Sequence, residues 1–414
     1  MAKQNPFRIH GTVEGEYFTN RQGELEKFAG ILSEPAAKMV VYGPRRMGKS
    51  STLDNVVRSI NKGGGHALIA DISTASTVTD IGNRILASAT RSIGKGWRDL
   101  ARDLVGRLQG SIRLAPDPTT GFMLPSFDVG LRQASLEAQR ESLAQVLDGL
   151  EALAASKKTN VGLVLDEFQD ITKFGGQDAE WHLRGIVQRH KQVSYIFAGS
   201  EEHLIRAMLG SGRAFYKMLD QHHFGPIDRD HMSSWIDQRM QTAGLTSSFA
   251  GAACVNLTGP RTRDIVQLAR KCVDRAVENT IGYEEVAASY VELIEDQDDS
   301  IRNWWDTLTS LQQNVLRAAA GSSAGLTTAD TRKRFSLESS GSITNAAAAL
   351  LDEGHLVRTD SGSGYVFDSP FVRGWVIIHA LPDIGVELAA THIASETAEY
   401  LAAASQAPGK EALS

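Results

Sequence analysis

One stretch constrains this 414-residue chain more than any other: an apolar run, a glycine-containing loop ending in Lys-Ser, and a helical continuation. Residues 39–42 are typical of a buried strand, and residues 51–57 predict the first turns of a helix. The loop between them reads Gly43-Pro44-Arg45-Arg46-Met47-Gly48-Lys49-Ser50, followed by Ser51. A G-x-x-x-x-G-K-S loop between a strand and a helix is the pattern of a phosphate-binding loop. We therefore expect a nucleotide site here.

Each part of this loop has a physical role. The glycines let backbone N–H groups point toward a phosphate, and the helix N-terminus adds the positive end of its dipole. Lys49 is expected to reach the β- and γ-phosphates, and the hydroxyl of Ser50 is expected to ligate Mg²⁺.

A second apolar run, residues 161–165, ends in Asp166 and Glu167. A buried strand ending in two acids is what a nucleotide hydrolase requires. Asp166 would order Mg²⁺ through its water, and Glu167 would polarise the attacking water as a general base. Such a strand end is also compatible with a solvated turn, but the phosphate loop upstream favours the functional interpretation.

A third apolar run, residues 193–199, leads into Ser200. A polar residue at this end of a strand in a doubly wound sheet faces the ligand crevice. Ser200 would therefore sense the γ-phosphate or hold the attacking water, or it would cap a helix over 201–209; the two roles are compatible. Arg213 and Arg184 are candidates for an arginine finger acting in trans, with a solvated surface position as the alternative for each.

Together these stretches resemble the archaeal-type ATPases of the STAND/AAA+ group of P-loop NTPases. The likeness is carried by residues 17–25, 43–51, 165–169 and 196–200, and also by 212–216 and 224–227. It implies a core with a five-stranded parallel sheet, ATP as the nucleotide, adenine near Asn20 and Arg21, and a helical lid after the core. Composition alone favours a simpler role for Asn20 or Thr19, as the cap of a helix over 24–32.

The lid segment 258–261 resembles the Gly-x-Pro sensor of this group, although Gly259 and Pro260 are adjacent here. The resemblance implies that Pro260 touches the nucleotide. Arg261 or Arg263 would sense phosphate from the lid, or would lie on a solvated helix over 263–277.

The expected fold class is α/β, with a P-loop AAA+-like parallel sheet core, a helical lid and a C-terminal winged helix. The expected domains are an ATPase core at 1–228 with an inserted hairpin near 111–128, a lid at 229–299, a winged helix at 300–380, and a tail helix with a disordered end at 381–414. The winged helix is predicted from three short helices, over 308–320, 327–335 and 342–353, which are followed by a hairpin.

The third of these helices, which would enter a major groove, has no Lys or Arg. Residues 301–375 hold seven Lys or Arg and seven Asp or Glu. Any contact with double-stranded DNA would fall to Arg332, Lys333, Arg334 and Arg358, which is a thin set of phosphate contacts. The sequence leaves DNA binding and protein docking both open.

Charge, cysteine content and hydropathy narrow the possible partners and the cellular location of the protein. The net charge of −6 gives no global nucleic-acid signal. The two cysteines form no ligand cluster, which favours a reducing cytoplasm. No apolar stretch approaches the roughly 20 residues of a membrane span, and the first 30 residues lack the apolar core of a signal peptide. We expect a cytoplasmic protein without a membrane partner.

The predicted function is a Mg²⁺-dependent ATPase whose ATP and ADP states are coupled to DNA binding or to assembly as a homo-oligomer. The alternative is a slow nucleotide-dependent switch that docks a partner protein, with a winged helix that does not bind DNA.

Overall fold

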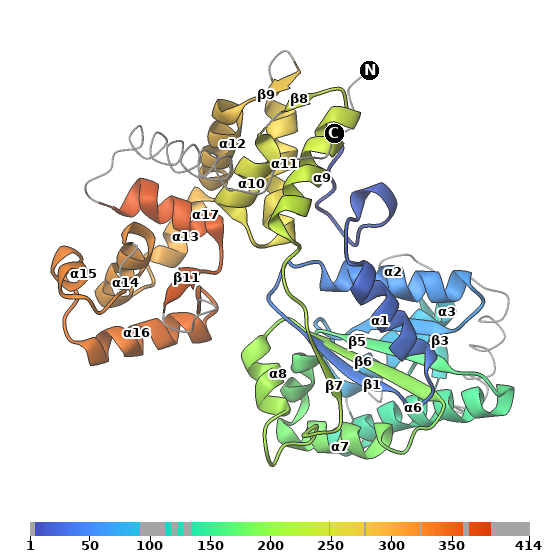
Figure 1. Ribbon diagram of the computed structural model, residues 1–414. Coiled ribbons are helices and arrows are strands. Elements are labelled where there is room, and N and C mark those ends of the chain that lie inside the picture. The colour runs from blue at the N-terminus through green and yellow to red at the C-terminus, as the bar shows by residue number, and fades with distance from the viewer. Residues whose placement is uncertain are drawn as a thin grey trace. The chain divides into compact units, whose positions relative to one another are not determined.

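The computed structural model describes residues 5–91, 112–116, 123–127, 134–247, 249–276, 279–322, 325–358 and 364–381. The chain divides into two compact units, one spanning Gly11–Gly225 and the other made of Met1–His10 and Pro226–Ser414 (Figure 1). The expected tail helix and disordered end lie outside the described residues, except for Leu381.

The first unit is built on a five-stranded parallel sheet in the order β2-β5-β6-β1-β7. The strands are β1 (Lys38–Tyr42), β2 (Ala67–Asp71), β5 (Val161–Asp166), β6 (Val193–Gly199) and β7 (Asp220–His223). The central strands β5 and β6 are buried at every residue, because parallel strands are covered on both faces. The five-stranded parallel sheet expected from the sequence is confirmed.

Helices cover both faces of this sheet. Met39 and Val41 of β1 join an apolar core beneath α1 (Gln22–Ser33) and α2 (Lys49–Lys62). The alternate residues Val40 and Tyr42 join a second core with side chains of α3 (Val78–Arg91), α6 (Leu136–Lys157) and α7 (Gln177–Val187). This alternation follows from the two-residue period of a strand. The unit is therefore a three-layer α/β/α structure.

Shorter elements complete the first unit. They are η1 (Gly15–Tyr17), β3 (Ile112–Pro116), β4 (Met123–Phe127), the 3-10 helix η2 (Phe168–Phe174) and α8 (Glu202–Met208). Strands β3 and β4 pair antiparallel within the region where the sequence predicts a hairpin, and β4 lies beside α3.

The second unit is mainly helical. Its first part contains α9 (Arg229–Thr242), β8 (Thr246–Ser247), α10 (Ala250–Thr258), α11 (Thr262–Arg275), β9 (Thr280–Ile281), α12 (Tyr283–Glu295) and α13 (Asp298–Trp305). Its second part contains α14 (Ser310–Gly321), α15 (Ala329–Arg334), α16 (Ser340–Asp352), β10 (Leu356–Arg358), β11 (Tyr365–Phe367), α17 (Pro370–Trp375) and the π-helical turn η3 (Val376–Ala380). None of the helices in the described part of the chain is long and apolar enough to cross a membrane.

Three helices and a hairpin form where the sequence predicts them in the second part. Helices α14, α15 and α16 begin after Thr309, Thr328 and Ser339, whose hydroxyls each accept a hydrogen bond from a backbone N–H of the first turn. Strands β10 and β11 pair antiparallel. The capping residues therefore set the starts of all three helices.

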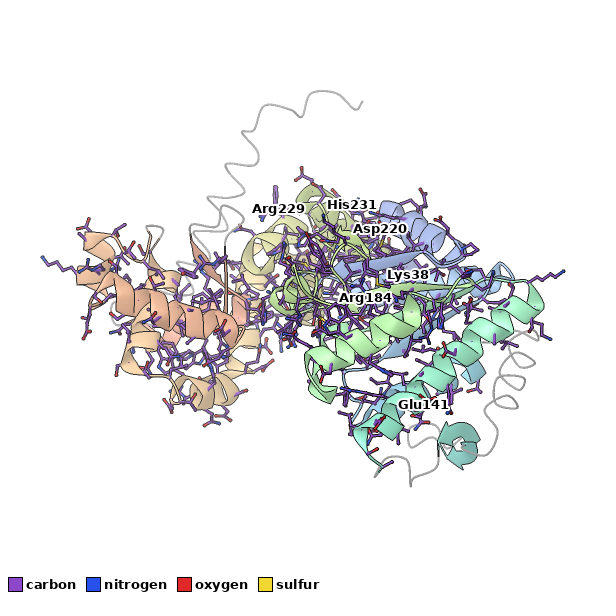
Figure 2. The ribbon with its side chains drawn as sticks, turned by 90° about the horizontal axis from the view of Figure 1, so that it is seen from below. Lys38, Glu141, Arg184, Asp220, Arg229 and His231 are labelled. Atoms are coloured by element: carbon purple, nitrogen blue, oxygen red, sulfur yellow. The ribbon has the colours of Figure 1, made fainter. Side chains whose placement is uncertain are left out.

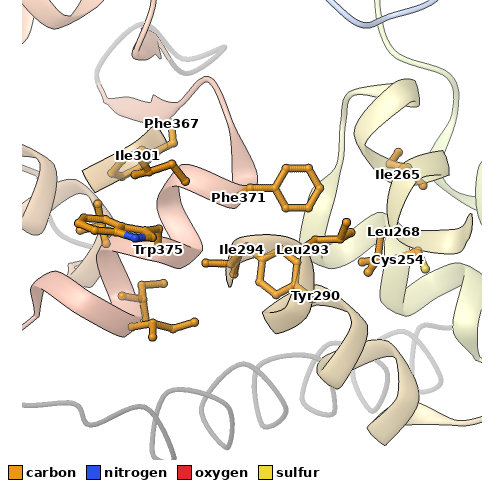
Figure 3. Packing of buried hydrophobic residues seen from close by; sticks show 14 of the residues in the cluster. Cys254, Ile265, Leu268, Tyr290, Leu293, Ile294, Ile301, Phe367, Phe371 and Trp375 are labelled. Atoms are coloured by element: carbon orange, nitrogen blue, oxygen red, sulfur yellow. The ribbon is translucent and has the colours of Figure 1, made fainter. Parts of the chain in front are cut away.

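One continuous apolar core runs through both parts of the second unit (Figure 3). Tyr290 and Ile294 of α12 belong to the same buried cluster as Phe371 and Trp375 of α17. The hydroxyl of Tyr290 also donates to the carbonyl of Pro370 at 2.7 Å. The boundary that the sequence suggests near residue 299 thus falls inside a single packed core.

The first residues of the chain also belong to this second unit. Phe7 is buried in its core, with its ring 5.8 Å from that of Trp235. Arg239 donates to the carbonyl of Pro6, and Arg270 donates to the carbonyl of Phe7. The expected core of 1–228 therefore needs a correction at its start, because the described residues 5–10 belong to the helical unit.

Candidate functional site

The phosphate-loop residues connect the end of β1 to the start of α2. Gly43 has no room for a side chain, because a Cβ there would collide with the backbone carbonyl of Phe224. The next residues bend back, with Arg46 and Gly48 in the left-handed region at φ of 68° and 94°. Helix α2 then begins at Lys49. The loop motif and the strand and helix expected beside it are all present.

The ammonium group of Lys49 lies against the backbone of the phosphate loop. Its side chain is buried, at 6% exposure, and Nζ donates to the carbonyl oxygens of Gly43 and Pro44 at 2.7 Å each. A cation is therefore held above the loop backbone, where a phosphate group would meet it.

Ser50 and Asp166 lie side by side at the carboxyl edge of the sheet. The Ser50 hydroxyl donates to Oδ2 of Asp166 at 2.6 Å. Asp166 is 5% exposed, and burial raises the pKa of its carboxyl group to about 6, an effect partly offset by the Ser50 hydrogen bond. The negative charge of Glu167 raises this pKa further. A divalent cation would offset the cost of the buried negative charge.

This pair fits a magnesium ion by its chemistry. A hydroxyl and a carboxylate are the hard oxygen ligands that Mg²⁺ takes from proteins, with its other positions filled by water and phosphate oxygens. Both side chains come from the positions that the sequence analysis assigned to the metal.

Glu167 follows Asp166 in a left-handed conformation, at φ 55°. Its Oε2 accepts a hydrogen bond from the hydroxyl of Ser200 at 2.7 Å. Arg45 of the loop donates from Nε to the same Ser200 oxygen at 3.3 Å and pairs with Glu201 at 2.6 Å. Hydrogen bonds among Glu167, Ser200 and Arg45 thus connect the ends of β5 and β6 to the phosphate loop.

The capping alternative for Ser200 is wrong. Helix α8 begins at Glu202 after Glu201, and no side chain caps its first turn. The hydroxyl of Ser200 is directed to Glu167 instead. The role at the ligand crevice, which the sequence analysis also gave for Ser200, stays a prediction.

Arg21 supports the loop from the side. Its guanidinium is buried, donates to the carbonyls of Met47 and Gly225 at 3.2 and 2.8 Å, and lies 4.1 Å from the ring centre of Phe224. Burial lowers its pKa, although Glu24 acts in the opposite direction. Arg21 therefore holds the loop and the end of β7 together through hydrogen bonds to their backbones.

The helix cap predicted at Asn20 or Thr19 is wrong. Helix α1 starts at Gln22, and Arg21 is its N-cap residue with no side-chain capping bond. The Asn20 side chain accepts a hydrogen bond from the backbone N–H of Arg21 at 2.7 Å. Both residues adopt positive φ, at 57° and 74°, so the chain turns sharply before the helix.

A segment before α1 lies along α2 and was missed by the sequence analysis. Asn55 donates to the carbonyl of Val13 at 2.7 Å, and the Val13 N–H donates to the hydroxyl of Ser51 at 3.3 Å. Thr12 donates to Asp54. The only signal was a polar face on α2 with helical spacing, which is equally typical of a solvated face.

The two candidate finger arginines contact their own unit. Arg213 forms a two-pronged ion pair with Glu180 of α7, whose side chain is fully buried. Arg184, also on α7 (Figure 2), donates to the backbone carbonyl of Ala214. Both arginines therefore join α7 to the loop that follows α8.

Pro260 and Arg261 belong to the second unit. A cis peptide bond joins Gly259 to Pro260, and Arg261 is the N-cap residue of α11. The Arg261 guanidinium is 5% exposed and forms a two-pronged ion pair with Asp368, whereas Arg263 is exposed.

Comparison with known proteins identifies the class of the core. Residues 34–208 match the family model of an AAA domain. A Walker-type ATPase of Pyrococcus abyssi has a similar structure, with a TM-score of 0.60 and 15% identity over 90% of this chain and all of that one. The ORC2 protein of Aeropyrum pernix, solved as ADPNP–ADP complexes, gives a TM-score of 0.55 and 12% identity over 94% of this chain and 96% of that one.

Because both sequence identities are below 25%, these two similarities show a shared fold only. The AAA-domain match and the fold together define the core as a P-loop ATPase of the AAA type, an enzyme that binds and hydrolyses ATP. Among curated proteins, no match to the chain is found.

Proposed function

We propose that this protein is a Mg²⁺-dependent ATPase that couples its nucleotide state to DNA binding or to assembly. The observation that carries the proposal is the adjacency of two hydrogen-bonded pairs at one edge of the sheet. Ser50 with Asp166 offers oxygen ligands, and Ser200 with Glu167 offers a held carboxylate. Together with Lys49, these groups supply what phosphoryl transfer to water needs.

The binding roles follow from the chemistry of the side chains. Lys49 would exchange its two carbonyl partners for oxygens of the β- and γ-phosphates. Ser50 and Asp166 would hold Mg²⁺, which neutralises phosphate charge when bound. The N–H groups of residues 43–51 at the start of α2 would bind the phosphates.

The hydrolytic step needs a base. Glu167 would accept the proton of the attacking water through its carboxylate. The hydroxyl of Ser200 would hold that carboxylate, or would turn to the γ-phosphate when nucleotide is present. Its hydrogen bond to Glu167 supports both roles, because it places the hydroxyl at the carboxyl edge of the sheet.

The remaining nucleotide contacts rest on the resemblance. We place adenine near Asn20 and propose that Pro260 touches the nucleotide. The contacts of Arg21 with Met47 and Gly225 support a loop-holding role for this residue. The ion pair of Arg261 with Asp368 supports a stabilising role, with phosphate sensing as the alternative.

The C-terminal helices and hairpin support a winged helix made of α14, α15, α16 and β10–β11. We propose that it contacts double-stranded DNA through Lys333, Arg334 and Arg358, and that ATP promotes assembly as a homo-oligomer. Cys254 and Cys272 are buried free thiols, which supports a cytoplasmic setting.

A second candidate function is a slow nucleotide switch that docks a partner protein. It is favoured by one observation: α16 carries no Lys or Arg and residues 301–375 are electrically balanced. Under this alternative, hydrolysis resets the switch and the winged helix binds protein instead of DNA.

The test of the proposal uses two substitutions and one control. Lys49→Ala removes the cation and should weaken ATP binding strongly. Glu167→Gln keeps the shape but loses the base, so ATP binding should persist while turnover falls by roughly two to four orders of magnitude. Glu26→Gln makes the same chemical change on the exposed face of α1 and should leave the affinity for ATP and the turnover rate unchanged. Turnover at the wild-type level in Glu167→Gln would overturn the assignment of the base.

A further inference from the structure

We infer that Gln169 is a positioning residue that orients the carboxylate of Glu167 for hydrolysis. This inference rests on the proposed function, in which Glu167 is the base. The amide of Gln169 donates from Nε2 to Oε2 of Glu167 at 2.7 Å. Because the Ser200 hydroxyl donates to that same oxygen at 2.7 Å, Oε2 is held by two donors from two separate segments, η2 and the residue after β6.

The other oxygen of the carboxylate is left for the reaction. Among the residues that the structure describes, no hydrogen bond to Oε1 of Glu167 is recorded, whereas Oε2 accepts two. A carboxylate oxygen held by two donors cannot swing, so the second oxygen has a defined direction. Gln169 and Ser200 thereby present Oε1 to the attacking water.

The backbone around Glu167 is also fixed. Its N–H donates to Oδ1 of Asp166 at 3.0 Å, and its carbonyl accepts from the N–H of Asp170 at 3.0 Å. Phe168 packs against Phe197 of β6, with ring centres 4.5 Å apart. The carboxylate therefore turns only about its own side-chain bonds, which is the freedom that Gln169 removes.

Stability alone does not explain why an amide is placed here. Gln169 is 2% exposed, and its Oε1 is a buried oxygen with no hydrogen-bond partner in the described part of the chain. A buried acceptor without a partner costs free energy of folding. The reverse amide orientation would set oxygen against carboxylate oxygen, because an ionised carboxylate only accepts. The side chain thus leaves one of its own groups unpaired while it donates to Glu167.

The neighbouring strand makes room for this amide. A Cβ at Gly199 would lie 2.7 Å from Oε1 of Gln169 and 2.7 Å from the side chain of Ile205. Real Cβ atoms do not approach other atoms so closely, so a side chain at position 199 would displace the amide. The glycine that precedes Ser200 is therefore part of the same arrangement.

The experiment measures kcat, KM and nucleotide affinity for Gln169→Leu, which removes the donor and keeps most of the volume. We expect kcat to fall about 10- to 100-fold, as for other residues that orient a reacting group. KM and the dissociation constant for ADP should stay within about twofold, since Gln169 touches the base and not the loop. Gln188→Leu, the same change at an exposed position of the first unit, is the matched control and should leave kcat unchanged.

Two further variants protect the test against a folding defect. Gln169→Glu keeps the size but places a second carboxylate against Glu167, and Gly199→Ala leaves both polar residues intact while displacing the amide. Each should lower kcat with little change in affinity for ADP, and thermal melting checks that each is folded. A kcat within twofold of wild type in the folded Gln169 variants, or a raised kcat, would overturn the inference.

A double-mutant cycle separates this inference from the proposed function. If Gln169 acts through Glu167, adding Gln169→Leu to Glu167→Gln should not lower the residual turnover further. A full additional loss in that background would overturn the positioning role. Wild-type turnover in Glu167→Gln alone would instead overturn the proposed base, whatever Gln169→Leu does.

Discussion

Arg261 and Asp368 form a two-pronged ion pair, although they are 107 positions apart in the chain. Nη1 of Arg261 lies 2.7 Å from Oδ2 of Asp368, and Nη2 contacts Oδ1. The pair joins the start of α11 to the residue before the cap of α17, within one unit. The charge that the sequence analysis assigned to phosphate sensing is therefore neutralised by a carboxylate of its own unit.

The first prediction concerns this pair. Asp368→Asn leaves a buried guanidinium without its anion, and should lower the free energy of unfolding by about 3 kcal/mol. Urea unfolding followed by Trp fluorescence measures the loss. Arg302→Gln breaks an exposed pair with Asp298 and should cost less than about 1 kcal/mol.

Affinity for ATP separates the two roles of Arg261. If the pair only stabilises the unit, folded Arg261→Met should bind ATP as tightly as wild type does. A loss of affinity in Arg261→Met that Asp368→Asn does not share would support phosphate sensing instead.

The second prediction concerns pH and Asp166. The pKa of this carboxyl is about 6 in the folded chain, against 3.8 ordinarily. Between these two pH values, the carboxyl is protonated in the folded state and ionised in the unfolded state. Stability from this group is greatest below about pH 4 and is lost as the pH rises through about 6. At 1.36 kcal/mol for each pH unit, the loss amounts to about 3 kcal/mol.

Asp166→Asn should remove this loss. Without Mg²⁺, the variant should be more stable than wild type above pH 6, with the difference fading toward pH 4, while its ATP turnover is lost. Denaturant unfolding at pH 4, 5, 6 and 7 measures the difference. A wild-type stability that follows the same pH curve as the variant would contradict the prediction.

The third prediction concerns Arg213 and Glu180. Arg213→Ala leaves the fully buried Glu180 without its cation, and should lower the free energy of unfolding by about 3 to 5 kcal/mol. Arg213→Met with Glu180→Leu should recover most of that loss, because neither charge then remains.

An arginine finger in trans makes a different prediction for Arg213. ATPase activity per chain would rise with protein concentration, and mixing Arg213→Ala with Glu167→Gln would restore some activity. We expect no rescue on mixing, since the guanidinium is already bound by Glu180; rescue would show that it leaves this partner during turnover.

The fourth prediction concerns DNA. Lys333, Arg334 and Arg358 are the exposed cations of α15 and β10, whereas Nε of Arg332 is buried. Three phosphate contacts predict sequence-independent binding with a log–log salt slope no steeper than about −3 for one chain. Titration of a labelled duplex at two salt concentrations, with and without ATP, measures this slope.

The control is a variant of two cations on α11, outside α15 and β10. The Lys333/Arg334/Arg358→Ala variant should lose duplex binding, whereas Lys271/Arg275→Ala, whose charges pair with Glu292, should not. Tight, sequence-selective binding that survives the triple change would contradict the prediction. Absence of binding under every condition would favour protein docking.

The sequence predicts the sheet and the motif residues well because their signals are local. Buried parallel strands read as unbroken apolar runs, and the loop, Asp166, Glu167 and Ser200 stand at the ends of such runs. Strand order then brings them together, since β6 lies between β1 and β5.

The partners of these residues were not predicted, because they depend on contacts between distant segments. Nothing near Arg21 in the chain indicates that it binds the carbonyls of Met47 and Gly225. Gln169 lies in a stretch that carries the resemblance, but nothing in the sequence indicates that its amide contacts the carboxylate of Glu167. Phe7 is a single apolar residue with no periodic pattern around it, so its burial in the second unit has no local signal.

The placement of Phe7 has a consequence for how the chain is connected. Because residues before Gly11 and after Gly225 belong to the same unit, the ATPase core is an insertion with two covalent links to the helical unit. A protease cut between Gly225 and Pro226 would leave the core still tethered through Phe7, which is buried in the helical core. Release of the core as a free fragment requires a second cut near Gly11, so limited proteolysis should pass through a nicked but undivided protein.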